Sequence, residues 1–304
     1  MRNQELSPIA VIGFNRADKL LITLQSLANN ILANQSDLFI FIDGPRSEKE
    51  GEFEKVQEVI SVAESISGFN SVTIKTSEVN KGLAKSIISA ATELLNRYGR
   101  VIVVEDDLYL SPSFLTYMNQ MLHLFENDSR IFQVSGYSAL INNKIESDVY
   151  LNARGQCWTW GTWKDRWETI DWEIKDFESF KNDRKKRNEW RKYGHDLFGM
   201  LTLWKKGRLN SWWIRFSYNM FKQGRYAVCP MKSLVRNDGF GVDSTHCNVY
   251  NRYKIEFDDK IHDSFYVPNT LEWDSKFNQH ATRFWSFRYR VYGKIMTLYY
   301  KLKR

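Results

Sequence analysis

The first third of the chain alternates between short apolar runs and longer segments in which apolar positions recur at helical spacing. The apolar runs are rich in Val, Ile and Phe and occupy residues 8–14, 38–42, 72–76 and 101–104. Runs of this length and composition are typical of buried strands. The segments with helical spacing are residues 19–30, 53–65 and 80–98. They predict amphipathic helices, and strands alternating with helices predict a mostly parallel sheet with right-handed crossovers.

Beyond residue 113 the pattern becomes less regular. The expected elements are helices at 114–125, 196–204 and 214–223 and strands at 132–135 and 226–229. Nine of the 11 Trp lie between Trp158 and Trp213, and the charge run at 181–191 reads as a solvated helix or loop. We therefore expect one domain in two halves, residues 1–140 and 141–262, followed by a tail at 263–304.

The apolar run at 101–104 ends in three consecutive acids, Glu105, Asp106 and Asp107. Carboxylates this close together repel one another and need a cation or several donors to remain ionised. Ligands bind at the carboxyl ends of parallel strands, and hard oxygen ligands suit Mg²⁺ or Mn²⁺, often shared with a phosphate. The alternative is an acidic loop before the next helix, because Ser111-Pro112 resembles an N-cap followed by Pro at the first helical position.

Two other polar turns follow predicted strands, Asn15-Arg16 and Asp43-Gly44. In a parallel sheet the ends of these strands open onto the same edge, so all three turns should meet there. No G-x-G-x-x-G follows the first strand and no Walker A motif occurs. This weakens the hypotheses of a dinucleotide enzyme or a P-loop protein.

Composition narrows the class of protein further. The 304 residues include 43% hydrophobic and 26% charged residues, with a formal net charge of +7, as in an ordinary globular protein. The three cysteines are odd in number and form no C-x-x-C pair, which favours a reducing compartment over a disulfide scaffold or structural zinc. With no secretory signal and no apolar run long enough to span a bilayer, we expect a cytoplasmic protein.

Residues 281–304 carry seven Lys or Arg, seven aromatic residues and no acid. A basic, aromatic, helix-compatible tail predicts peripheral contact with an anionic membrane, here at the inner face of the cell membrane. A terminal helix whose aromatic side chains pack on the body, with its cations in water, is an equally good interpretation.

Several motifs together carry a resemblance to a known family. In order they are Pro8–Ile12 with Asn15-Arg16, Asp43-Gly44, Asn80-Lys81-Gly82, and Val103–Leu108 followed by Ser111–Phe114. They resemble the nucleotide-diphospho-sugar glycosyltransferases of the GT-A fold, most of all N-acetylglucosaminyltransferase I and its bacterial relatives. The resemblance covers residues 8–140 well, 150–246 loosely and the tail not at all. It implies an α/β GT-A fold in which residues 1–140 bind the nucleotide-sugar and 141–262 the acceptor.

The resemblance also implies roles for the polar turns. Arg16 and Asp43 would hold the nucleotide, with Asp43 accepting from the uracil N–H, and Asp107 would bind Mn²⁺ or Mg²⁺. Glu105 and Asp106 would contact the sugar and ribose or support the ion through water. The other donor-side candidates are Asn15, Lys81, Lys85 and Ser244, and His246 is a second candidate metal ligand. The lysines fit simple exposure on a helix equally well, and His246 fits an ordinary loop histidine.

Inversion at the anomeric carbon needs a general base near the acceptor hydroxyl. In the animal enzyme this base is an Asp that follows a Trp at a helix start, but the corresponding stretch, Asn210–Arg215, contains no carboxylate. The candidates elsewhere are Asp196 at a helix start, then Asp238 and Asp243 in the Gly-containing segment 237–246. That segment looks like the mobile loop that such enzymes fold over the donor.

The tryptophan-rich segment 156–163 lies where relatives place the donor sugar and the acceptor. Aromatic faces stack on sugar C–H groups. We expect most of these tryptophans to be core residues, and Trp160 and Trp212 to be exposed and bind the acceptor.

These observations predict an inverting, metal-dependent glycosyltransferase that moves a sugar, with N-acetylglucosamine a candidate, from UDP. The acceptor would be a saccharide or lipid-linked saccharide in surface polysaccharide assembly. The alternatives are a nucleotidyltransferase, or a non-catalytic carbohydrate- or nucleic-acid-binding protein. We expect no nucleic-acid partner, because acids such as Asp165 and Glu168 interrupt the Trp cluster.

Overall fold

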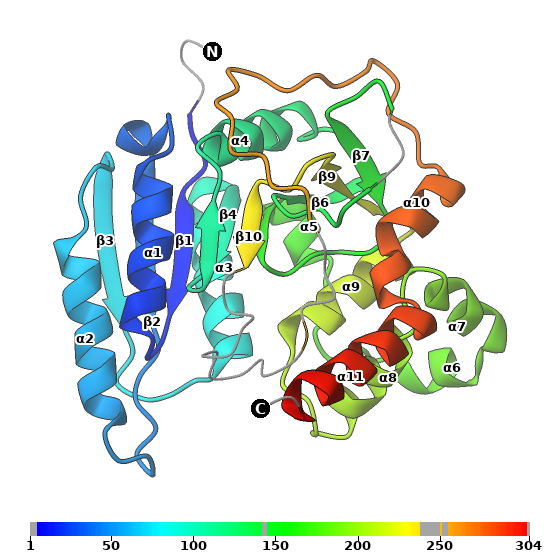
Figure 1. The fold of residues 1–304 in the computed structure, drawn as a ribbon, viewed down its shortest axis with the longest axis horizontal. Coiled ribbons are helices and arrows are strands. Elements are labelled where there is room, and N and C mark those ends of the chain that lie inside the picture. Colours follow the sequence, from blue (N-terminus) through cyan, green and yellow to red (C-terminus); the bar gives the residue numbers. More distant parts are fainter. Residues whose placement is uncertain (1–4, 142–144, 238–249, 251–254, 303–304) are drawn as a thin grey trace.

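A central sheet of eight strands organises the molecule (Figure 1), in a computed structural model that describes residues 5–141, 145–237, 250 and 255–302. The strand order is β3-β2-β1-β4-β8-β6-β9-β7. The strands are β1 (Ile9–Gly13), β2 (Asp37–Ile42), β3 (Ser71–Thr76), β4 (Arg100–Glu105), β6 (Ile131–Ser135), β7 (Val149–Asn152), β8 (Thr159–Trp163) and β9 (Tyr226–Pro230). Only β7 and β8 run against the others. The predicted α/β fold with a mostly parallel sheet is confirmed.

Helices cover both faces of the sheet, because side chains of neighbouring strand positions point to opposite sides. Val11 and Ile40 pack toward α1 (Ala17–Ala28), α2 (Glu52–Ser65) and α4 (Phe114–Leu124), whereas Ala10 and Phe39 pack toward α3 (Leu83–Tyr98). The remaining helices are α5 (Lys164–Glu168), α6 (Phe177–Asn182), α7 (Arg184–Arg191), α8 (Leu197–Lys205), α9 (Trp212–Lys222), α10 (Ser275–Thr282) and α11 (Phe287–Leu302), with 3-10 turns η1 (Ala33–Gln35) and η2 (Arg283–Trp285).

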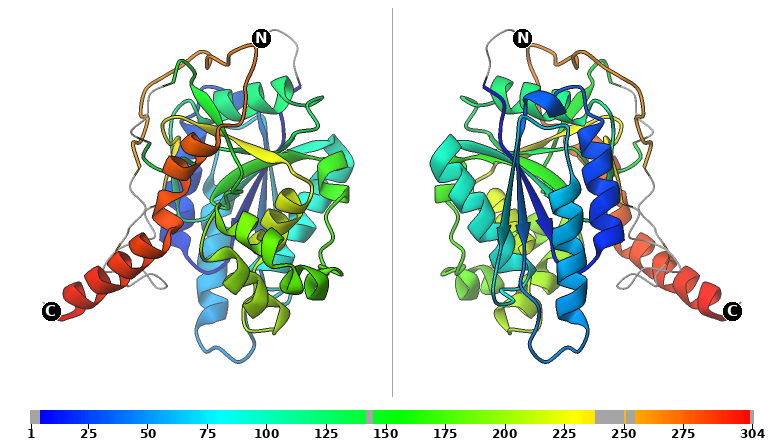
Figure 2. Two further views of the ribbon diagram at one scale, coloured as in Figure 1. Left: turned by 90° about the vertical axis from the view of Figure 1, so that its right-hand side faces the viewer. Right: turned by 90° about the vertical axis from the view of Figure 1, so that its left-hand side faces the viewer.

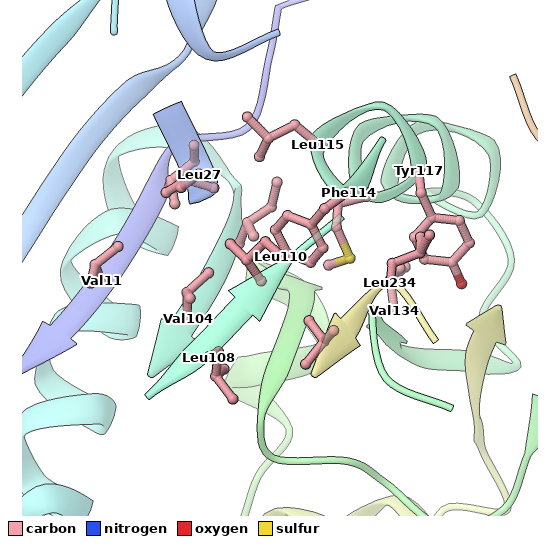
Figure 3. Packing of buried hydrophobic residues seen from close by; sticks show 14 of the residues in the cluster. Val11, Leu27, Val104, Leu108, Leu110, Phe114, Leu115, Tyr117, Val134 and Leu234 are labelled. Atoms are coloured by element: carbon pink, nitrogen blue, oxygen red, sulfur yellow. The ribbon is translucent and has the colours of Figure 1, made fainter. Parts of the chain in front are cut away.

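The acidic turn after β4 is held by a short strand that the sequence pattern did not predict. This strand, β5 (Leu108–Leu110), pairs antiparallel with β10 (Val235–Asn237). Leu108 and Leu110 are buried with Val104 and Leu27 in one apolar cluster (Figure 3). The backbone on both sides of Glu105–Asp107 is therefore anchored in the core, which fixes the direction of the three carboxylates.

The two predicted halves share one sheet, whereas the C-terminal helix stands apart from it. The sheet contains strands from both sides of residue 140, with β6 lying between β8 and β9. The C-terminal helix α11 instead projects away from the body (Figure 2). Within the part of the chain that the structure describes, no helix is both long and apolar enough to cross a membrane.

Candidate functional site

The three predicted polar turns meet at one edge of the sheet. Strands β2, β1 and β4 are neighbours in that order, and each turn follows the carboxyl end of one of them. Arg16 joins two of the turns, because its Nη1 donates to Asp107 Oδ2 at 3.1 Å and its Nη2 donates to Asp106 Oδ1. One guanidinium thus lies against an acidic turn with three carboxylates. The structure brings Arg16, Asp106 and Asp107 together as the sequence predicted.

The charge in this turn is only partly compensated. Burial, with the nearby Asp107 and Asp106, raises the pKa of Glu105 well above its usual value. Burial also raises the pKa of Asp106 to about 6, although the Arg16 charge acts in the opposite direction. Among the residues that the structure describes, no donor is hydrogen-bonded to the Glu105 side chain. The turn is therefore an environment in which an added cation would be stabilised.

The Asp43 carboxylate connects its turn, by hydrogen bonds, to the segment that precedes α3. Its Oδ1 accepts from the backbone N–H groups of Gly44 at 3.0 Å and Lys81 at 2.8 Å, and its Oδ2 accepts from Gly82 N–H at 2.8 Å. A carboxylate offers about four acceptor positions, so three donors leave one for a ligand. Gly44 is required at this crossing, because a Cβ there would lie 2.6 Å from the carbonyl carbon of Val79.

Asn15 belongs to a network that the sequence did not reveal. Its Nδ2 donates to Glu52 Oε1 at 3.1 Å, and Glu52 is buried while it accepts from Arg46 Nε at 2.8 Å. The hydrogen bonds from Arg46 outweigh burial and lower the pKa of Glu52 to about 2. Arg46 also lies 5.3 Å from the ring centre of Phe14. The position of Arg46 directly after Asp43-Gly44-Pro45 was the one sequence signal that could have pointed to this network.

The two lysines predicted on the donor side are both exposed at the start of α3. Lys81 lines a pocket of about 220 Å³ that also includes Asp43 and Ser77 and extends between α3 and the edge strand β3. Lys85 is not among its lining residues. Lys81 is therefore the lysine that shares a concave surface with Asp43.

Asp196 is positioned for a structural task. Its two carboxylate oxygens accept from Arg154 Nη1 at 3.0 Å and Nη2 at 2.9 Å. The Arg154 guanidinium lies between the rings of Trp213, at 4.8 Å, and Trp285, at 4.5 Å. Burial is the largest single influence and opposes ionisation of Asp196, but the charge of Arg154 and the hydrogen bonds to the carboxylate together outweigh it, so the pKa of Asp196 is lowered. A carboxylate engaged on both oxygens is a poor general base, which argues against the role predicted for it.

The expectation that Trp160 and Trp212 are exposed is wrong. Their side chains are 0% and 3% exposed, and their ring centres lie 4.8 Å apart. Strand β8 carries Trp160 into the middle of the sheet, between β4 and β6, where α9 covers it. Neither ring presents a face that a sugar could stack on, so this structure gives them no part in acceptor binding.

The start of α9 nevertheless lies beside the site. The side-chain amide of Asn210 is so close that a Cβ on Gly82 would be 3.3 Å from its Nδ2. Ser211 caps α9, its Oγ accepting from Ile214 N–H at 3.3 Å. The stretch Asn210–Arg215 thus begins next to the Lys81-Gly82 turn. Four further predicted residues, Asp238, Asp243, Ser244 and His246, lie outside the described residues.

The sheet topology, the acidic turn at the end of β4 and the carboxylate at the end of β2 agree with the resemblance to GT-A nucleotide-sugar glycosyltransferases. A model of the GNT-I family matches residues 2–152. The resemblance that the motifs predicted is therefore confirmed for the half of the chain that contains these turns.

Solved structures of S. aureus TarS 1-349 are also similar to this chain. The crystal structure without a named ligand has 12% identity and a TM-score of 0.40, and the match covers 73% of this chain and 57% of that one. The complex with UDP-GlcNAc has 12% identity, a TM-score of 0.36 and coverages of 74% and 56%. The complex with UDP has 16% identity, a TM-score of 0.28 and coverages of 49% and 36%. At most, the chain spans little more than half the length of these structures.

Proposed function

We propose that the protein is a metal-dependent, inverting glycosyltransferase that moves a sugar from a UDP-sugar to a saccharide acceptor. The observation that carries this proposal is the acidic turn Glu105–Asp107, compensated by Arg16 alone among the described residues and placed beside the Asp43 turn. The family match covers both turns. N-acetylglucosamine is the sugar that we propose, because the resemblance is to N-acetylglucosaminyltransferase I.

The residues of the acidic turn fit a divalent cation that is shared with the substrate. Within the described ranges, no three side chains of His, Cys, Asp or Glu are arranged to hold a metal ion by themselves. Asp107 has a partly exposed carboxylate, and among the described residues the one donor to its Oδ1 is Asn237 Nδ2, at a long 3.5 Å. Such a carboxylate suits Mg²⁺ or Mn²⁺, which commonly take one or two protein carboxylates and complete their shell with phosphate oxygens and water. Bound there, the cation would stabilise the charge on the departing diphosphate.

The chain's own residues would divide the remaining work. The free acceptor position of Asp43 would receive the uracil N–H, and Lys81 would add positive charge at the same pocket. Glu105, whose pKa is raised well above its usual value by burial and by the nearby Asp107 and Asp106, would contact the sugar of the donor. Arg16 would hold Asp106 and Asp107 in place before the donor arrives.

Inversion also requires a general base near the acceptor hydroxyl. Asp196 is engaged by Arg154 on both oxygens, and the stretch at the start of α9 has no carboxylate. We therefore assign the base to Asp238 or Asp243. Replacing each by Asn in turn should leave UDP binding intact, and loss of transfer in one of the two variants would identify the base. Full activity in both variants would refute the assignment.

Calorimetric titration with UDP, with and without Mn²⁺, tests the donor site. We expect tight binding only when Mn²⁺ is present, and we expect Asp107→Ala to abolish the effect of the metal. Replacing the exposed Asp263 by Ala is the matched control, because it removes a carboxylate remote from the acidic turn in sequence. An affinity for UDP that changes neither with Mn²⁺ nor with Asp107→Ala would contradict the proposed site.

We also propose that α11 brings the enzyme to the cytoplasmic face of a membrane and to a lipid-linked acceptor. The helix exposes large apolar side chains along most of its length: Phe287, Tyr289, Val291, Tyr292, Ile295, Leu298 and Tyr299. It projects from the body at the end of the molecule where β1 and β2 reach the donor turns (Figures 1 and 2). Exposed apolar residues among cations are the composition of a helix that lies in a membrane interface.

A further inference from the structure

Helix α7 presents an unusual concentration of unpaired cations. Residues 184–192 contain six Lys or Arg and a single acid, Glu189. Five of the cations are exposed: Arg184, Lys185, Lys186, Arg191 and Lys192. Among the residues that the structure describes, none of the six forms an ion pair with a carboxylate. Cations this crowded, with a single acid among them, repel one another, so an anionic partner would stabilise this surface.

The direction in which these cations point is fixed by packing. Trp190, the buried residue of α7, lies 5.7 Å from Phe221 with the two rings stacked, and 5.4 Å from Tyr218. Arg187 lies 5.1 Å from the ring centre of Phe198, on the side of the helix that faces the body. The apolar contacts thus occupy one face of α7 and leave the other face, with Arg184, Lys185 and Lys192, along a shallow open groove.

The segment that follows α7 is hydrogen-bonded to the segment that precedes α11. The backbone N–H of His195, three residues after Lys192, donates to Trp285 O at 3.2 Å, immediately before α11 begins. Arg191 from α7 and Arg290 from α11 both lie near His195; burial first, and then these two charges, lower the pKa of the imidazole. The last turn of α7 and the first turn of α11 therefore both place a cation near His195.

We infer that α7 and α11 form a single membrane-binding surface, in which α7 binds anionic lipid headgroups while α11 inserts apolar side chains between the lipids. The inference rests on the membrane contact that we propose for α11, and it adds a second element with a different chemistry. A lipid surface uses both features together, whereas a soluble polyanion would use the cations and leave Ile295 and Leu298 in water. The exposed apolar residues are what favour the lipid surface over a nucleic acid or an acidic polymer.

Sedimentation with vesicles of phosphatidylcholine, with or without phosphatidylglycerol, tests this inference on the full chain. The α7 variant carries Arg184→Gln, Lys185→Gln and Lys192→Gln. Each cation near an anionic bilayer contributes about 1 kcal/mol, which is about fivefold in affinity, so the triple variant should bind anionic vesicles on the order of 100-fold more weakly. The matched control neutralises three exposed cations elsewhere, Lys49→Gln, Lys55→Gln and Arg97→Gln, and should change binding far less.

A second variant separates this inference from the proposal on which it rests. Ile295→Ser with Leu298→Ser should weaken binding to both kinds of vesicle, because it removes inserted apolar area. The inference would be overturned if this variant lost vesicle binding while the α7 variant lost no more binding than the control. In that case the membrane contact of α11 would still hold. Stronger binding of the α7 cations to soluble polyphosphate than to anionic vesicles would also overturn it, in favour of an acidic polymer. UDP binding should be unchanged in every variant, which shows that each one is folded.

Discussion

The acidic turn makes a specific prediction about how stability depends on pH. Burial raises the pKa of Asp106 from 3.8 to about 6 in the folded protein. The carboxyl group therefore keeps its proton in the folded state at pH values at which the unfolded chain has lost it. The contribution of the Asp106 carboxyl group to the free energy of unfolding is fully present below pH 3.8 and is lost as the pH rises through about 6. The metal-free protein should thus become less stable over this window on account of Asp106.

The magnitude follows from the size of the shift. A rise of about 2 units, at about 1.4 kcal/mol per unit, corresponds to about 3 kcal/mol. Replacing Asp106 by Asn removes the ionisation but keeps an oxygen that can accept from Arg16. The variant should gain up to about 3 kcal/mol relative to the parent protein on going from pH 4 to pH 7.5. Its stability at low pH should be close to that of the parent, because the parent carboxyl is protonated there.

Urea unfolding of both proteins at several pH values, in the presence of a chelator, measures this difference directly. Asp263→Asn is the control, since it removes an exposed carboxyl group and should show no comparable gain. Adding Mn²⁺ together with UDP should reduce the advantage of Asp106→Asn, because a bound cation compensates the parent turn. A variant whose stability relative to the parent does not rise with pH would refute the reasoning about this buried carboxylate.

Three other substitutions test the packing around the site. Asp43→Asn places an amide NH₂ against a backbone N–H donor; it should cost about 2–3 kcal/mol of stability in urea unfolding and weaken UDP binding, and unchanged values of both would contradict the hydrogen bonding described here. Gly44→Ala forces a Cβ to within 2.6 Å of the Val79 carbonyl carbon; the shifted turn should lower the free energy of unfolding by about 1–3 kcal/mol, and a fully stable variant would argue against this close crossing. Arg154→Ala leaves Asp196 buried without its cation and should cost about 3–5 kcal/mol; adding Asp196→Ala should recover part of that loss, and a further loss of the same size would show that the two residues act independently.

Much of the fold could be read from the sequence, because its first half follows simple local patterns. The predicted strands at 8–14, 38–42, 72–76 and 101–104 correspond to β1, β2, β3 and β4 with small differences at their ends. Alternation of strand and helix requires a parallel sheet, and parallel strands place their carboxyl ends at one edge. The convergence of Arg16 with Asp106 and Asp107 followed from this geometry alone.

The second half depended on contacts between residues far apart in the chain. From the sequence, Trp160 was expected to be exposed and to stack on a sugar. Strand β8 lies antiparallel between β4 and β6, however, and this position buries Trp160. No local pattern reports such an insertion, because the partners of β8 come from different parts of the sequence. The short strand β5 was missed for the same reason, since its pairing partner β10 is more than a hundred residues away.

The sequence by itself therefore determined the chemistry of the site, namely which acids and cations stand at strand ends. Only the tertiary structure decided which of these groups remain available to a substrate. Asp196 is engaged by Arg154, and Asn15 by Glu52, in pairs separated by 42 and 37 residues. The physical reason is that a buried charge must find a partner, and which partner it finds is settled by the packing of distant elements rather than by neighbours in sequence.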